Sequence, residues 1–260
     1  MSIKVSTGLA NQVSDRIGFR HALSRGRLQL YSGVQPTSSD LASNGTLLAT
    51  ITQSGAAFTA ETLPAWTITL SGAAGSVDSI KVGGLDLLTG SVAFTTDLTT
   101  TAAAIATMIT NNFSLVDYTA TSSGAVVTIN GPIGSGAKLN ACVCSATSTT
   151  LTATISNSGA PSTLGVDAVG GLLFAFPSAA GLFSMSGSWS GLGVAAGTMG
   201  WFRYLCDGAD NGVNATTTYR RFDGTVTVAG GGGDLLVDNV SAAVGQLINV
   251  TSFNMGVSKG

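Results

Sequence analysis

Between Lys138 and Arg203 the chain carries one charged residue, Asp167, and the stretch from 168 to 202 carries none. An uncharged run of this length either crosses a membrane or lies against protein, because about 20 apolar residues suffice for a membrane helix. Eight glycines and Pro177 interrupt the run, however, and glycine disfavours a helix. We therefore expect no membrane span. The pattern predicts strands and loops that lie against other protein, within the chain or between copies.

The composition of the whole chain limits the fold class in the same direction. Charged residues make up 9% of the 260 residues, and Glu61 is the single glutamate. A helical bundle or coiled coil would need many more charged residues, whereas 44% hydrophobic residues are enough for a folded core. The chain therefore resembles a β protein rich in Gly, Thr, Ser, Val and Ala, with a surface suited to burial in an assembly.

The spacing of apolar residues predicts two helices, at 8–24 and 99–111, the second capped by Thr99 or Thr100. Alternating patterns predict strands throughout the rest of the chain. They fall at 27–32, 46–52, 66–70, 77–82, 85–88, 91–94, 118–121, 125–130, 151–155, 199–206, 219–222, 224–228, 235–237 and 246–253. We predict a mainly β fold. Residues 1–64 and 160–260 would form a discontinuous β-sandwich or jelly-roll-like body with a short N-terminal helix, and residues 65–159 an inserted small α+β module.

Charge is distributed unevenly along the chain. The first 30 residues hold five basic residues and one acid, which is +4, and the remainder holds six bases and twelve acids, which is −6. The basic segment is either a solvated helix face or a docking end that meets an acidic partner surface or nucleic acid. The net charge of −2 argues against nucleic-acid binding by the whole molecule.

Candidate catalytic and metal-binding residues are few, and we predict no enzyme, cofactor or metal site. His21 is the only histidine and is expected at the surface or an interface of the first helix. Residues 230–233 are four glycines followed by Asp234, which is not a phosphate-binding loop. Residues 207–212 resemble a calcium loop only faintly and are expected to form a hairpin turn. The three cysteines suggest reduced, mostly buried thiols.

The adjacent residues Arg220 and Arg221 lie on a predicted strand, so their side chains should point to opposite faces. Asp223 and Asp234 are possible intrachain partners, and an ion pair between copies is the functional alternative. The tryptophans at 66, 189 and 201 could stack on sugars but are more often core or interface anchors.

Two regions carry a resemblance. The segments GRLQLYSGVQPTSSDLASNGTLLATIT, at 26–52, and GTMGWFRYLCDGADN with FDGTVTVAGGGGDLLVDNVSAAVGQLINVTSF, within 197–253, resemble small structural proteins encoded in the virion gene blocks of tailed bacteriophages. The segment from WTITLSGAAGSVDSIKVGGLDLL to DYTATSSGAVVTINGPIGSGAKLNACV resembles a module of phage tail-sheath, tail-fibre and other virion proteins. Typical members of the first family lack this insertion.

The resemblance implies a non-enzymatic structural protein of a bacteriophage virion, a capsid decoration or head–tail (neck/collar) component. The alternatives are a tail component such as a tube, baseplate or fibre-base subunit, and a host-surface-binding adhesin. The implied partners are major capsid, portal/connector or tail proteins. The resemblance also implies that the chain forms a homo-oligomer. The N-terminus lacks the pattern of a signal peptide, so we expect synthesis in the host cytoplasm and assembly into the virion.

The candidate interface combines the basic N-terminal segment with large apolar residues of the charge-poor part of the chain. Its residues are Arg16, Arg20, Arg25, Arg27, Leu172, Phe174, Phe183, Trp189 and Trp201.

Overall fold

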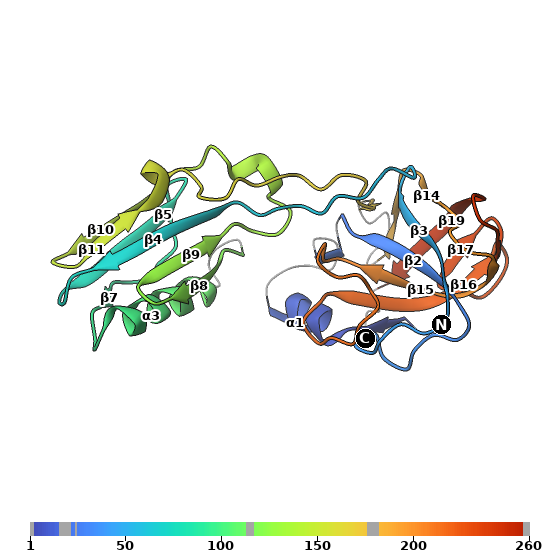
Figure 1. Ribbon diagram of the computed structural model, residues 1–260, viewed down its shortest axis with the longest axis horizontal. Coiled ribbons are helices and arrows are strands. Elements are labelled where there is room, and N and C mark those ends of the chain that lie inside the picture. Colours follow the sequence, from blue (N-terminus) through green and yellow to red (C-terminus); the bar gives the residue numbers. More distant parts are fainter. Residues whose placement is uncertain (1–2, 16–21, 24, 113–116, 176–181, 257–260) are drawn as a thin grey trace. The chain divides into compact units, whose positions relative to one another are not determined.

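The computed structural model describes residues 3–15, 22–23, 25–112, 117–175 and 182–256 (Figure 1). The chain divides into two compact units. We call the first, Met1–Ala60 with Ala168–Gly260, the body, and the second, Glu61–Asp167, the insert. This is the discontinuous arrangement expected, with the boundaries after residues 60 and 167 instead of 64 and 159. Each unit has its own hydrophobic core.

Seven strands of the body form a closed strand ring, in which each strand is hydrogen-bonded to two others. Around the ring they are β2 (Arg27–Ser32), β3 (Leu47–Gln53), β14 (Trp189–Leu192), β19 (Leu247–Gly256), β17 (Leu235–Val237), β16 (Arg221–Val228) and β15 (Gly197–Leu205). The short strand β17 closes the ring because it pairs with both β16 and β19. The contact between β16 and β17 is parallel, and the other contacts within this ring are antiparallel.

Shorter strands extend the ring at several points. Those outside it are β1 (Lys4–Val5) on β16, β18 (Ser241–Ala242) on β15, β13 (Leu182–Ser186) on β19 and β12 (Leu173–Phe174) on β13. The predicted mainly β class is confirmed. The uncharged run at 168–202 contributes β12, β13, β14 and most of β15. The absence of charge from this run is consistent with strands that pack within the body.

Alternation along the ring strands directs every second side chain inward. On β15 the inward side chains include Phe202 and Tyr204, which meet Phe222 of β16. The Tyr204 and Phe222 rings stack at 4.7 Å between centroids. Aromatic pairs of this kind add to the apolar area that the core buries.

The N-terminal helix α1 (Thr7–Asp15) is capped by the preceding residue Ser6, whose hydroxyl accepts a hydrogen bond from the backbone N–H of Leu9 at 3.1 Å. Leu9 is fully buried in the body core. Gly8 is required for the close approach of this helix, because a Cβ there would lie 2.5 Å from the carbonyl oxygen of Thr218. The rest of the predicted helix includes residues 16–21 and 24, which lie outside the described residues.

The described strands of the insert form two four-stranded sheets. One has the order β11 (Thr152–Ile155), β4 (Ala65–Ser71), β9 (Val126–Asn130), β8 (Thr119–Ser123). The other consists of β10 (Cys144–Thr149), β5 (Ser76–Val82) and β6 (Leu85–Asp86), with β7 (Val92–Ala93) also on β5. The insert also contains the helix α3 (Leu98–Thr110) and two short 3₁₀ helices, η1 (Gly136–Leu139) and η2 (Ser156–Gly159).

Helix α3 (Leu98–Thr110) packs against β8 and β9 (Figure 1). Its buried face includes Ile105 and Ile109, as the apolar spacing predicted. The cap differs from the expectation. Asp97, not Thr99 or Thr100, caps the helix, because its carboxylate accepts the backbone N–H of Thr100 at 2.7 Å.

Candidate functional site

Four apolar residues predicted at an interface lie instead in the interior of the body. Leu172, Trp189 and Trp201 have no exposed surface, and Phe174 is 4% exposed. Phe174 packs edge-on against Trp189 at 5.3 Å between centroids, and Trp189 stacks on Phe253. The interface prediction is therefore wrong for these four, because a side chain without exposed surface has none to offer a partner. The backbone of Phe183 belongs to β13, but its side chain lies outside the described residues.

The predicted basic docking surface is only partly described. Arg16 and Arg20 lie outside the described residues, as does His21. Arg25 is half-buried, and its backbone N–H donates to the carbonyl of Leu172 at 2.9 Å.

Arg27 is also held within the body. Its guanidinium lies 4.6 Å from the ring centroid of Phe58 and donates to the carbonyl of Asp210. Burial lowers the pKa of Arg27 from its ordinary value. Arg27 is therefore engaged inside the body, which leaves little of it for a partner.

The outer face of β2, β15 and β16 carries a buried polar and aromatic layer. The rings of Tyr31 and Trp201 stack at 4.5 Å between centroids, and the guanidinium of Arg203 lies 5.4 Å from the Trp201 ring. Tyr31 is 2% exposed, and Trp201 and Arg203 have no exposed surface. These side chains point away from the ring core, so other parts of the body must cover them.

Three arginine–aspartate pairs join residues of β15, β16 and the segment between these strands, and we call them the arginine clamp. The pairs are Arg203–Asp223 at 2.7 Å, Arg220–Asp207 at 2.6 Å and Arg221–Asp210 at 2.5 Å. Arg203 and Arg221 each donate from two nitrogens to the two oxygens of their aspartate, the geometry in which a guanidinium binds a carboxylate most strongly. Arg220 donates from two guanidinium nitrogens to one oxygen of Asp207, and its backbone N–H donates to the other.

The clamp holds down the loop that follows β15. Arg203 also donates to the carbonyl of Gly212, and Arg221 to that of Asn214, each at 2.8 Å. Asp210 is itself part of this loop, so three contacts tie the loop to β15 and β16. The Arg220–Asp207 pair joins residues at the two ends of the loop, and the Arg203–Asp223 pair joins the two strands. Burial raises the pKa of Asp223, while its bonds to Arg203 act in the opposite direction.

These pairs correct two expectations. The partners of Arg220 and Arg221 are Asp207 and Asp210, not Asp223 or Asp234. The calcium-like pattern at 207–212 is a loop whose two carboxylates bind arginines, which leaves neither of them as a free cation ligand. No group of three or more His, Cys, Asp or Glu residues in the described part of the chain could hold a metal ion.

An exposed apolar patch lies on the body where β14, β19 and the turn before β19 meet. It consists of Leu192, Val194, Val244 and Leu247, which are 59%, 58%, 73% and 54% exposed. Leu192 and Leu247 are directly opposite each other in the antiparallel pair, so their side chains share one face. We call these four residues the charge-free patch.

Backbone hydrogen bonds join the segments around Gly193, Gln246 and Leu48 at this patch. Gly193 donates to the carbonyl of Gln246 and accepts from the N–H of Gly245, both at 2.8 Å, and Val194 donates to the carbonyl of Leu48. The three segments concerned, 41–60, 168–202 and 239–256, contain no charged residue. Contiguous exposed apolar surface of this kind marks interaction sites more often than scattered apolar residues do.

The sequence signal for this patch is the alternation of glycine with large apolar residues at 191–194. In Gly191–Leu192–Gly193–Val194, the small residues face inward and the large ones face outward. A Cβ on Gly191 would lie 2.1 Å from the carbonyl oxygen of Thr50, and one on Gly193 2.1 Å from that of Ala243. Glycine is therefore needed on the crowded side, which leaves Leu192 and Val194 for the surface.

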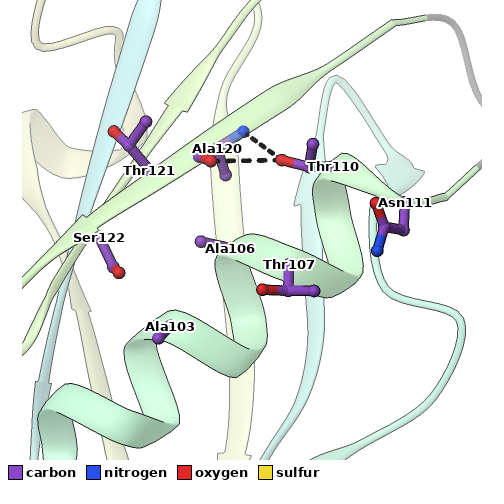
Figure 2. A pocket seen from close by; sticks show the side chains of 8 residues that line it. All are labelled: Ala103, Ala106, Thr107, Thr110, Asn111, Ala120, Thr121 and Ser122. Carbon is purple, nitrogen blue, oxygen red and sulfur yellow. Dashed lines mark hydrogen bonds between the residues drawn. The ribbon is translucent and has the colours of Figure 1, made fainter.

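A groove in the insert runs between α3 and the outer edge of β8, and Figure 2 shows its lining. It encloses about 400 Å³. Its lining residues are short and uncharged: Ala103, Ala106, Thr107, Thr110, Asn111, Ala120, Thr121 and Ser122. None of the described residues that line the groove carries a carboxylate, imidazole or thiol, the groups that general acid–base or nucleophilic catalysis most often uses.

The three cysteines are free thiols in the structure. Cys144 and Cys206 are buried, and Cys142 is half-buried. Burial raises the pKa of Cys144 to about 11 and that of Cys206 further still. None of the described helices is long and apolar enough to cross a membrane.

Comparison with known proteins gives no match to this chain, whether with family models, with curated proteins or with solved structures.

Proposed function

We propose that this chain is a non-enzymatic structural component of a bacteriophage virion, a capsid decoration or head–tail protein that acts through protein–protein contacts. The observation that carries the proposal is the charge-free patch of Leu192, Val194, Val244 and Leu247 on the body. The resemblance of segments 26–52 and 197–253 to phage virion proteins supplies the biological setting. The partner would be a major capsid, portal/connector or tail protein.

The patch has the chemistry of a surface that is buried on assembly. Burying apolar area contributes about 25 cal/mol per Å². Lysine and glutamate would lose side-chain entropy and hydration in such a contact, whereas the short branched side chains of the patch lose little. A subunit that docks through this patch therefore gains apolar burial without leaving a charge unpaired.

The arginine clamp supports the same function. Three contacts fix the loop at 207–214 on β15 and β16, so this part of the body presents a fixed surface. A fixed surface loses less conformational entropy on binding.

A tail component would use the same patch. The location of the protein in the particle distinguishes a tail component from a decoration or head–tail protein. An adhesin that stacks sugars on tryptophan is not favoured, because Trp66, Trp189 and Trp201 all have no exposed surface.

The test is a double variant, Leu192→Asp with Val244→Asp, supplied in place of the wild-type chain during phage production. A charge at each position would have to be buried without a partner, so we expect incorporation into particles to fall by about tenfold or more. The matched control is Leu85→Asp, at a 41% exposed leucine of the insert. Equal incorporation of the double variant and the wild type, with both proteins folded, would remove the support that the patch gives.

A further inference from the structure

The outer edge of β8 is open to pairing. Within the described part of the chain, β8 pairs with β9 and with no second strand. The N–H of Ala120 donates to the hydroxyl of Thr110 at 3.0 Å, and this hydroxyl donates to the carbonyl of Ala120 at 3.2 Å (Figure 2). The peptide groups of Ala120 therefore face away from β9. Because hydrogen-bonding direction alternates along an antiparallel strand, those of Ser122 face the same open side.

The groove beside this edge leaves room for another strand. Helix α3 presents Ala103 and Thr107, both exposed, toward a groove of about 400 Å³. Long side chains at these positions would cover the edge, as proteins usually arrange for exposed strands. Here one hydroxyl, that of Thr110, covers one residue of the edge.

We infer that β8 pairs antiparallel with β8 of a second copy of this chain, about a twofold axis near Ser122. The two four-stranded sheets of the inserts would then form one eight-stranded sheet. Identical antiparallel edges satisfy each other's N–H and carbonyl groups, as a twofold contact requires. The groove contains no charged residue, so the contact brings no like charges together.

The twofold arrangement also explains the short side chains of α3. Pairing about an axis perpendicular to the sheet places both α3 helices on the same face of the joined sheet, flank to flank. Helices in contact approach to about 8–10 Å between their axes, depending on the side chains between them. Alanine and threonine at 103 and 107 suit such an approach, and large residues there would hold the helices apart.

The Thr110 side chain opposes pairing of the β8 edge with a second copy, because it is hydrogen-bonded to the backbone of Ala120. In the register centred on Ser122, Ala120 faces Gly124 of the second copy, and the Thr110 hydroxyl competes for the groups of Ala120. Thr110→Ala removes both this hydroxyl and the volume that it occupies beside Ala120. The variant should therefore dimerise more tightly than the wild type.

The experiment is sedimentation equilibrium of the full chain from about 1 to 200 µM, a range that brackets weak to moderate self-association. We expect a monomer–dimer equilibrium that Ala103→Glu weakens by at least about tenfold. Ala104→Glu is the matched control, because Ala104 is the next residue of α3, is also exposed and does not line the groove. Ser122→Pro should weaken the dimer as well, because it removes an N–H on the open side and spares the ladder with β9.

A wild-type chain that stays monomeric over this range would overturn the inference. A dimer equally sensitive to Ala103→Glu and Ala104→Glu, or insensitive to both, would overturn it too. The inference concerns the insert and is independent of the proposed function. The variant Leu192→Asp with Val244→Asp should therefore leave the dimer unchanged.

Discussion

The Nε and Nη2 atoms of Arg203 donate to the two carboxylate oxygens of Asp223 at 2.9 and 2.7 Å, and neither side chain has exposed surface. The two residues are directly opposite each other on β15 and β16, so the register of the ring places them together. The third donor of the guanidinium binds the carbonyl of Gly212 in the covering loop. One buried pair thus connects the strand ring to the loop on its outer face.

Removing one charge of this pair should destabilise the body strongly. We expect Asp223→Asn to lower the free energy of unfolding by about 3–5 kcal/mol, because Arg203 would stay buried without its counterion. The double variant Arg203→Met with Asp223→Leu should recover most of this loss, because it removes both charges and keeps apolar volume. Urea unfolding of the two variants and the wild type measures the difference. A single variant as stable as the wild type would contradict the role given to the pair.

Truncating a core residue should destabilise the body much more than truncating a residue of the charge-free patch. Phe174→Ala should lower the free energy of unfolding by about 3–5 kcal/mol, because it leaves a cavity against Trp189 and Phe253. Leu192→Ala, at a 59% exposed residue, should change it by no more than about 0.5 kcal/mol. Thermal or urea unfolding followed by tryptophan fluorescence gives both values. The reverse order would restore Phe174 as a candidate surface residue.

The cap of α3 should make the insert sensitive to acid. The hydrogen bond from the backbone of Thr100 lowers the pKa of Asp97 from its ordinary value. A carboxylate with a lowered pKa in the folded state contributes stability above the pKa of the unfolded chain, about 3.9, and this contribution is lost as the pH falls through the lowered value. Asp97→Asn keeps an acceptor for the cap but does not titrate. Its stability should therefore fall less between pH 6 and about pH 3 than that of the wild type, as urea midpoints at the two pH values would report.

The three thiols should react at different rates. Cys142 is half-buried, whereas Cys144 and Cys206 are buried with raised pKa values, so few of their thiolates are present at neutral pH. A thiol reagent applied to the native protein at pH 8 should modify Cys142 first and the other two only after unfolding. Mass spectrometry of the labelled peptides identifies the order. Rapid native labelling of Cys206 would show that the body opens more easily than its packing indicates.

Much of the fold follows from local sequence pattern. The alternation at 27–32, 66–70 and 126–130 and the apolar spacing of α3 depend on neighbouring residues, so the sequence predicts them. Strand β10, which reads CSATST, has no large apolar residues to alternate and was not predicted. The helix is capped by Asp97 and not by the expected threonines, because three polar residues stand on each side of Leu98 at its start and spacing alone does not choose among them.

The candidate site was predicted less well, because exposure depends on contacts between distant parts of the chain. Trp201 lies on the outer face of its strand, yet it has no exposed surface, and its ring stacks on Tyr31 and lies beside Arg203. The clamp that fixes the loop at 207–214 joins residues of β15, β16 and the loop through pairings that depend on the register of the ring. Leu172 and Leu192 come from the same uncharged stretch, yet one is buried and the other is 59% exposed.

Immunogold labelling of intact particles tests the central claim most directly. Particles produced from the genome that encodes this chain would be labelled with an antibody against the chain, and particles that lack the gene serve as the control. The account predicts label on the particle, spread over the head for a decoration protein or confined to the neck for a head–tail protein. Label on the tail would assign the protein to the tail components. The absence of label from every particle, with the antibody shown to bind the native chain, would contradict the proposal that it is a virion protein.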